Sequence, residues 1–172
     1  MNLLQRIFLF FFLIATPMSL SAQKREVIKL DQLLTILNNK SDSLLVLNFW
    51  ATWCKPCVEE MQEFLRIEQE IENKKVRFVY LSLDFKKDFD TKLVPFVNKR
   101  KMMSDVFLLD EPDYDAWINM VEPTWQGSIP ATLFLAPNAE NRHFHEGQLT
   151  YLELKKIING NDIFVYTKHL PS

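Results

Sequence analysis

The chain has 172 residues, with 20 lysines and arginines against 22 acids, a formal net charge of −2 and two cysteines. A near-neutral balance without a basic patch gives no reason to expect nucleic-acid binding. Residues 23–172 are enough for one ordinary domain with a full hydrophobic core, and any disulfide within the chain must join the two cysteines.

The first 22 residues have the pattern of a secretory signal peptide. Arg6 supplies a positive charge, residues 7–15 form an apolar core, and Ser19–Ala22 provide small residues for cleavage. A membrane-spanning helix needs about 20 apolar residues, so this core is short for a retained anchor. We therefore expect cleavage after Ala22 or one residue earlier, and export, most simply to a periplasm. An uncleaved signal that anchors the chain in the membrane is the alternative.

Helix and strand patterns alternate after this segment, which is typical of an α/β sheet with helices on both faces. Asp31 is expected to cap a helix over 31–39. The apolar run at 44–50 predicts a buried strand, and an amphipathic pattern at 56–73 predicts the helix that follows it. Residues 76–83 predict a second buried strand.

The alternation continues in the second half. Pro95 must kink or restart the helix expected over 87–101, because proline in a helix interior removes a backbone donor. The other expected elements are a strand at 105–109, a helix at 113–121, a strand at 131–136 with a hairpin partner at 142–146, and a helix at 150–159. The tail from Asn161 has no clear pattern, and Phe164 and Tyr166 could pack or be loose.

Both cysteines lie in the sequence Trp53-Cys54-Lys55-Pro56-Cys57, where the strand at 44–50 leads into a helix. Unpaired N–H groups and the macrodipole at a helix N-terminus favour a thiolate, which is the form that attacks a disulfide. The spacing permits a disulfide and leaves the first sulfur outermost, so Cys54 is expected to attack and Cys57 to resolve.

The stabilisation that a helix terminus can give a thiolate is large enough for a redox-active cysteine pair. A helix terminus can supply up to about 2 kcal/mol, which would bring a thiol pKa from about 8.5 to near 7. Lys55 adds a positive charge that water screens. A purely structural disulfide is the weaker interpretation, because a bridge over so short a loop stabilises little through chain entropy.

Zinc is a further interpretation of the cysteine pair, which would supply two of the four ligands that a structural site needs. His143 and His145 could supply the others. However, 85 residues separate Cys57 from His143, and the two histidines alternate with Phe144 on an expected strand. Exposed strand residues are the simpler interpretation, so we expect neither a metal ligand set nor a cofactor.

The segment from Asn48 to Cys57, followed by Gly127 to Thr132, resembles the thioredoxin superfamily and, more narrowly, its exported TlpA/ResA-type thiol–disulfide oxidoreductases. The resemblance covers about residues 26–159. It implies a thioredoxin-like α/β fold, with a central mixed sheet of four or five strands flanked by helices. It also implies a TlpA-type central insertion, which would hold the strand and helix over 105–121 and the loop at Trp125.

The same resemblance implies a substrate groove. Pro130 would follow a cis peptide bond and face the cysteines. The backbone of Ile129 would then point toward Cys54, where an extended substrate segment could pair with it. Trp53 and Trp125 complete the expected substrate-binding residues, although an ordinary core position is the other interpretation of Trp125.

An acid for proton transfer is implied as well. Thioredoxins proper carry an aspartate where this chain has Asn48, which cannot titrate, and TlpA-like proteins often carry a glutamate that matches Glu60. If Glu60 is buried, desolvation should raise its pKa and suit it to proton exchange. The other interpretation is a solvated acidic helix face with Glu59 and Glu63. Asn48, Lys55 and Pro56 are expected to surround the reacting groups.

These residues predict an exported enzyme that reduces protein disulfides through Cys54 and Cys57. Its partners would be disulfide-containing exported proteins, which in the family include apocytochrome c and metal-site proteins, and a membrane electron donor. One alternative is a thiol peroxidase of the same superfamily, against which the Trp-Cys-x-Pro-Cys sequence argues. The other is a copper-delivery protein that would need His143 or His145 near the thiols. Lys55 and Pro56 do not fix the redox potential.

Overall fold

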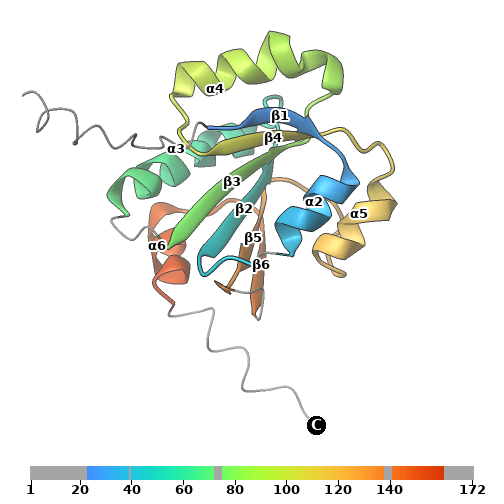
Figure 1. The fold of residues 1–172 in the computed structure, drawn as a ribbon. Coiled ribbons are helices and arrows are strands. Elements are labelled where there is room, and N and C mark those ends of the chain that lie inside the picture. Colours follow the sequence, from blue (N-terminus) through green and yellow to red (C-terminus); the bar gives the residue numbers. More distant parts are fainter. Residues whose placement is uncertain (1–22, 39, 72–74, 138–140, 161–172) are drawn as a thin grey trace, which may run out of the picture.

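The computed structural model describes residues 23–38, 40–71, 75–137 and 141–160. These residues form one six-stranded sheet in the order β1-β4-β3-β2-β5-β6, with helices on both of its faces (Figure 1). The expected signal peptide and the tail from Asn161 lie outside the described residues. Within the described ranges, no helix is both long and apolar enough to cross a membrane.

The centre of the sheet is β2 (Leu44–Trp50), whose seven residues are all buried because helices cover both faces. It pairs in parallel with β3 (Val76–Ser82) and antiparallel with β5 (Ala131–Leu135). The mixed sheet and the hairpin between β5 and β6 (Arg142–Glu146) confirm the predicted pattern.

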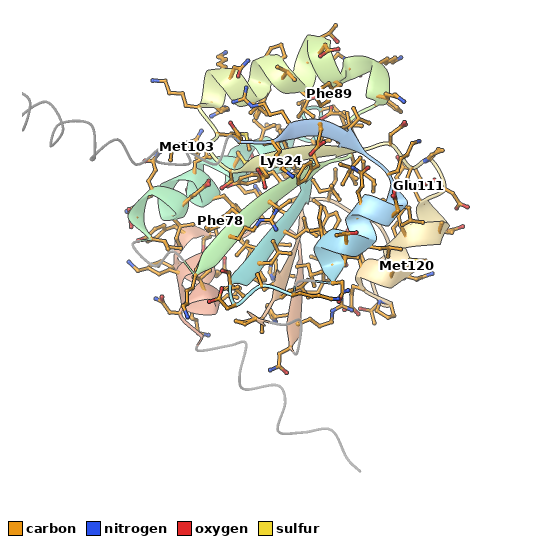
Figure 2. The ribbon with its side chains drawn as sticks, viewed as in Figure 1. Lys24, Phe78, Phe89, Met103, Glu111 and Met120 are labelled. Atoms are coloured by element: carbon orange, nitrogen blue, oxygen red, sulfur yellow. A yellow bond between two sulfur atoms is a disulfide. The ribbon has the colours of Figure 1, made fainter. Side chains whose placement is uncertain are left out.

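The parallel half of the sheet continues from β3 to β4 (Asp105–Leu109) and then to β1 (Arg25–Ile28). In Figure 2, Met103 and Glu111 lie at opposite ends of β4. The sheet has six strands rather than the four or five that were expected, because β1 adds an edge strand. Its burial pattern explains why no strand was predicted there, since only Ile28 is fully buried.

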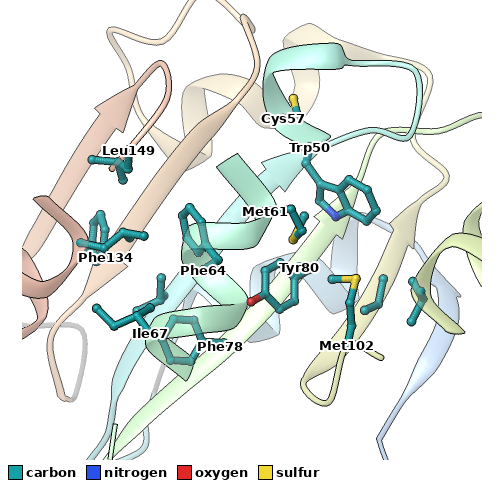
Figure 3. Packing of buried hydrophobic residues seen from close by; sticks show 14 of the residues in the cluster. Trp50, Cys57, Met61, Phe64, Ile67, Phe78, Tyr80, Met102, Phe134 and Leu149 are labelled. Atoms are coloured by element: carbon teal, nitrogen blue, oxygen red, sulfur yellow. The ribbon is translucent and has the colours of Figure 1, made fainter. Parts of the chain in front are cut away.

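Helices α3 (Lys55–Glu70), α4 (Val94–Arg100) and α6 (Tyr151–Ile158) cover one face. The opposite face is covered by α2 (Leu30–Leu37) and α5 (Tyr114–Val121). Buried apolar residues form a cluster between the sheet and each layer of helices. Figure 3 shows the cluster under α3, α4 and α6, in which Cys57 lies near Trp50, above Met61 and Phe64. The cysteine pair therefore sits at the end of a continuous core.

One expected helix start is corrected, and the expected effect of Pro95 is confirmed. The N-cap of α2 is Lys29 rather than Asp31, and the Gln32 side chain accepts the Lys29 N–H at 3.0 Å. The helix expected over 87–101 starts anew at Val94, one residue before Pro95. A 3₁₀ turn at Lys86–Asp88 and a π turn at Phe89–Leu93 lead into α4, and Pro95 is the second residue of that helix. Proline is tolerated there because a first-turn N–H has no intrahelical acceptor.

Candidate active site

Cys54 and Cys57 form a disulfide where β2 passes into α3, with their Cα atoms 5.3 Å apart. Cys54 is the N-cap of α3, and its Sγ accepts the Cys57 N–H at 3.3 Å. Pro56 is the second helical residue, a position that needs no donor. Cys54 is 6% exposed and Cys57 is 0% exposed, so the sulfur of Cys54 is the outer one.

The start of β5 lies beside this sulfur. The Ile129–Pro130 peptide bond is cis, as the resemblance implied, and the Ile129 carbonyl oxygen lies 3.8 Å from Cys54 Sγ. The antiparallel pairing of β5 with β2 brings these positions together, although they are 75 residues apart. Pro130 is buried and Ile129 is half-buried, so the main chain of Ile129 lies at the rim of the site.

Glu60 is buried below the cysteines, with only 3% of its surface exposed. Its Oε1 accepts the Asn48 side-chain N–H at 2.9 Å, and its Oε2 accepts the Leu149 backbone N–H at 3.0 Å. Burial raises the pKa of Glu60 from 4.5 to about 7, against the opposing effect of these two hydrogen bonds. Glu60 is therefore not part of a solvated acidic face. Residues three apart on a helix are neighbours, so Glu60 adjoins Cys57.

Asn48 links this carboxylate to β5. Its side-chain nitrogen also donates to Thr132 Oγ1 at 3.1 Å, and both Asn48 and Thr132 are buried. Thr132 ends the Gly127–Thr132 segment, but neither its role nor that of the Leu149 N–H was predicted. Thr132 stands two residues after Pro130, and that position is the only signal that could have indicated it.

Glu60 also lines a cavity of about 560 Å³ between α3 and α6. Gln148, on the wall of this cavity, donates to the Pro56 carbonyl at 3.0 Å and so joins the loop before α6 to the first turn of α3. The cavity brings solvent toward the carboxyl group, which gives a route by which protons reach a buried acid.

The loop that carries Cys54 is held by Asp84, a residue that sequence analysis missed. The Asp84 carboxylate accepts the Thr52 N–H at 3.0 Å, the Thr52 hydroxyl at 2.5 Å and the Ser82 hydroxyl at 2.7 Å. Its place two residues after β3 was the available signal, because neighbouring parallel strands end at the same edge of the sheet. Trp53 is exposed, and exposed Lys55 pairs with Glu59 at 3.7 Å.

Comparison with known proteins identifies the family of this chain. The sequence profile of the AhpC/TSA family matches residues 14–143. The chain belongs to the AhpC/TSA family. It is 27% identical over 139 residues to the thiol-disulfide oxidoreductase ResA of Oceanobacillus iheyensis, covering 76% of this chain and 64% of the relative. It is 25% identical over 120 residues to the thioredoxin-like protein YneN of Bacillus subtilis, covering 70% and 66%. The chain thus spans just under two thirds of the length of these curated relatives.

Solved structures agree on the fold. A thioredoxin-related protein from Neisseria meningitidis serogroup B superposes with a TM-score of 0.59 at 22% identity, covering 70% of this chain and 84% of that one. This likeness confirms the predicted thioredoxin-like fold, and the relatives named above are consistent with it.

In this member of the AhpC/TSA family, Trp125 is not a groove residue, and the expectation that it contacts substrate is wrong. Its side chain is fully buried and packs against Phe49, Trp117 and Phe144, with ring centroids 4.8, 5.6 and 5.4 Å away. Its indole N–H donates to the Ser128 carbonyl at 2.9 Å. Trp125 therefore packs beneath the backbone segment that leads to Ile129 and supports it.

The two histidines of the metal hypotheses lie on β6, where His143 is opposite Phe134 and His145 is opposite Thr132. His145 Nε2 lies 3.3 Å from the Gln148 carbonyl oxygen. Among the residues that the structure describes, no group of three or more His, Cys, Asp or Glu side chains could hold a metal ion. The described part of the chain thus offers no ligand set that joins these histidines to the cysteines.

Proposed function

We propose that this protein is an exported thiol–disulfide oxidoreductase that reduces the disulfides of other exported proteins. The observation that carries the proposal is the Cys54–Cys57 disulfide at the start of α3, with the Ile129 carbonyl oxygen 3.8 Å from the outer sulfur. The name of ResA, a relative that this chain partly covers, supports the same chemistry. Export is proposed from the first 22 residues.

The reaction begins with both cysteines reduced. At the helix N-terminus, the Cys57 N–H and the macrodipole favour the Cys54 thiolate. The thiolate attacks one sulfur of the substrate disulfide, a mixed disulfide forms, and the other substrate sulfur leaves as a thiolate. Cys57 then attacks the Cys54 sulfur, which releases the second substrate thiolate. Two electrons pass to the substrate, and the protein is left with its own disulfide.

Cys57 must lose its proton before this second attack, and Glu60 is the group proposed to take it. With a pKa of about 7, Glu60 is ionised in about half of the molecules at neutral pH, so it can accept and return a proton there. The cavity between α3 and α6 connects that proton to solvent. Asn48 orients the carboxylate that receives it.

The substrate would approach across the rim formed by Ile129 and Pro130. An extended segment could pair with the Ile129 main chain, and exposed Trp53 offers an apolar contact beside Cys54. Each turnover leaves the protein oxidised, so a membrane electron donor is needed to reduce it again. The chemistry resides in the two sulfurs and requires no cofactor.

A trapping experiment tests the roles of the two cysteines. Cys57→Ser should accumulate a mixed disulfide between Cys54 and a substrate protein such as insulin, detected as a mass increase that reducing agent removes. Cys54→Ser should form none. Equal trapping by both variants, or by neither, would contradict the proposal. If the reduced protein consumed hydrogen peroxide but no protein disulfide, a thiol peroxidase would take its place.

The direction of the reaction is tested separately by equilibration with glutathione. Related proteins span about −270 to −120 mV, and we expect a potential on the reducing side of the middle of that range. A value near −120 mV would contradict the reducing direction and leave the exchange chemistry intact.

A further inference from the structure

Three large aromatic side chains are exposed among the described residues, namely Trp53, Phe85 and Tyr114. They follow the carboxyl ends of β2, β3 and β4, in that order. Because these strands are neighbours and parallel, their carboxyl ends lie at the same edge of the sheet as the cysteines. Exposed apolar groups that share one edge are a mark of an interaction site.

A pocket of about 200 Å³ lies between the segments that carry Phe85 and Tyr114. Trp117, which is fully buried, lines it, and the Tyr114 ring packs on Trp117 with centroids 6.0 Å apart. The other apolar lining residues are Leu83, Leu109 and Pro112. A dry cavity of about 150 Å³ holds a benzene molecule, so this pocket has room for one large apolar side chain.

The pocket is joined to the loop of the cysteines. Asp84, on the pocket wall, accepts the Thr52 N–H at 3.0 Å, and Thr52 is two residues from Cys54. Leu83, also on the wall, donates its N–H to the Trp50 carbonyl at 2.8 Å. The pocket is therefore built on the loop that follows β3, and that loop is hydrogen-bonded to the segment leading to Cys54.

Charge does not dominate this surface. Asp110, at the pocket, lies 2.9 Å from the ammonium groups of both Lys29 and Lys86. The Asp84 carboxylate is occupied by the three hydrogen bonds described above. Asp84 and Asp110 are thus engaged within the protein and Glu111 is the other acidic lining residue, so the apolar side chains of the lining are what the pocket offers to an apolar ligand group.

We propose that the Phe85–Tyr114 pocket binds a large apolar side chain of the substrate polypeptide, close in sequence to the cysteine that Cys54 attacks. This inference rests on the proposed function and narrows its substrate class. The preferred substrates are then extended disulfide-containing segments in which apolar residues flank the cysteine, rather than small disulfides or polar segments. Phe85 becomes a specificity-determining residue.

Two synthetic peptides with the same internal disulfide test this assignment. They differ only in the residues that flank the cysteines, which are Phe and Leu in one peptide and Gly and Ser in the other. The reduced wild-type protein should reduce the apolar peptide with a kcat/KM about tenfold higher, the scale expected from burying part of one large side chain. Phe85→Ser should remove this preference and leave the rates with the polar peptide and with glutathione disulfide unchanged. Phe85→Leu should keep the preference.

Met103→Ala is the matched control. Met103 is 66% exposed, as Phe85 is 63% exposed, but it precedes β4 and lies at the opposite end of that strand from Glu111, which lines the pocket (Figure 2). This variant should discriminate between the peptides as the wild type does.

Equal rates with both peptides, or discrimination that survives Phe85→Ser, would overturn the inference while the proposed function stands. Dissociation of a dimer by Phe85→Ser, with discrimination unchanged, would assign the pocket to a second copy of the chain and overturn it too. Failure of the wild type to reduce any of the three disulfides would instead overturn the proposed function, and the inference with it.

Discussion

Two glutamates on α3, Glu60 and Glu68, have pKa values shifted in the same direction but are proposed to play different roles. Burial raises the pKa of both carboxyl groups, and hydrogen bonds oppose the rise in both. Glu60 accepts an amide N–H from Asn48 and a backbone N–H from Leu149. Glu68 accepts the hydroxyl of Tyr80 at 3.0 Å and also binds the hydroxyl of Ser104.

What separates the two glutamates is their neighbourhood. Glu60 is three residues after Cys57 and lines the cavity between α3 and α6. Glu68 is eight residues further along the helix, and its partners tie α3 to β3 and to the loop before β4. A raised pKa therefore indicates burial of the carboxyl group. A catalytic role is indicated only when a reacting group, such as the Cys57 thiol, lies within reach of the carboxyl proton.

The largest expected effect concerns stability and pH. The folded protein holds the Glu60 proton up to about pH 7, while the unfolded chain releases it near 4.5. Unfolding therefore releases a proton between these values, and stability falls as pH rises through them. Glu60→Gln removes this titration. Its free energy of unfolding relative to the wild type should increase by about 3 kcal/mol between pH 4.5 and pH 8, measured by urea denaturation of the oxidised proteins.

Glu68→Gln should change the pH dependence in the same direction, because burial raises the pKa of Glu68 as well. A stability difference for Glu60→Gln that stays flat across this pH range would show that Glu60 titrates near its ordinary value. That outcome would remove the physical basis for its proposed role.

Activity should separate the two residues. If Glu60 takes the proton of Cys57, Glu60→Gln should lower the rate of insulin reduction by the reduced protein at pH 7 by about 100-fold, the lower end of general acid–base contributions. Glu68→Gln should stay within about twofold of the wild type, because its carboxyl group binds the hydroxyls of Tyr80 and Ser104 and lies eleven residues along the chain from Cys57. Equal losses in both variants would indicate a structural effect of charge removal in α3.

Much of this arrangement could be predicted from the sequence, because local patterns determine it. The apolar run of β2, the cysteine spacing and Pro56 all lie within one stretch of chain, and they indicate a strand, a helix and a redox pair directly. Glu60 was a candidate only through the resemblance to TlpA-like proteins, because the local pattern alone was equally consistent with a solvated acidic face. β1 was missed because an edge strand with one fully buried residue has no apolar run.

The remaining features depend on contacts between distant segments. Thr132 meets Asn48 across 84 residues, and the Leu149 N–H meets Glu60 across 89. Strand register and the docking of α6 create these contacts, and neither leaves a local signal. Trp125 was misjudged for a related reason. Its place near Pro130 in the chain suggested the groove, but α5 and β6 supply the aromatic rings that bury it.

The smallest expected effect tests how Asn48 tunes the acid. Its N–H bonds the Glu60 carboxylate and lowers the pKa of that group, so Asn48→Leu should raise it. A hydrogen bond to a charged group contributes about 1.5 kcal/mol or more, which corresponds to about one pH unit. The midpoint of the rise in insulin reduction with pH should move upward by about that amount.

Each pH profile is scaled to its own plateau, so a loss of stability does not mimic the shift. Ser104→Ala removes the corresponding bond from Glu68 and should leave the midpoint unchanged. A midpoint that moves in both variants, or in neither, would mean that the proton of Glu60 does not limit the reaction.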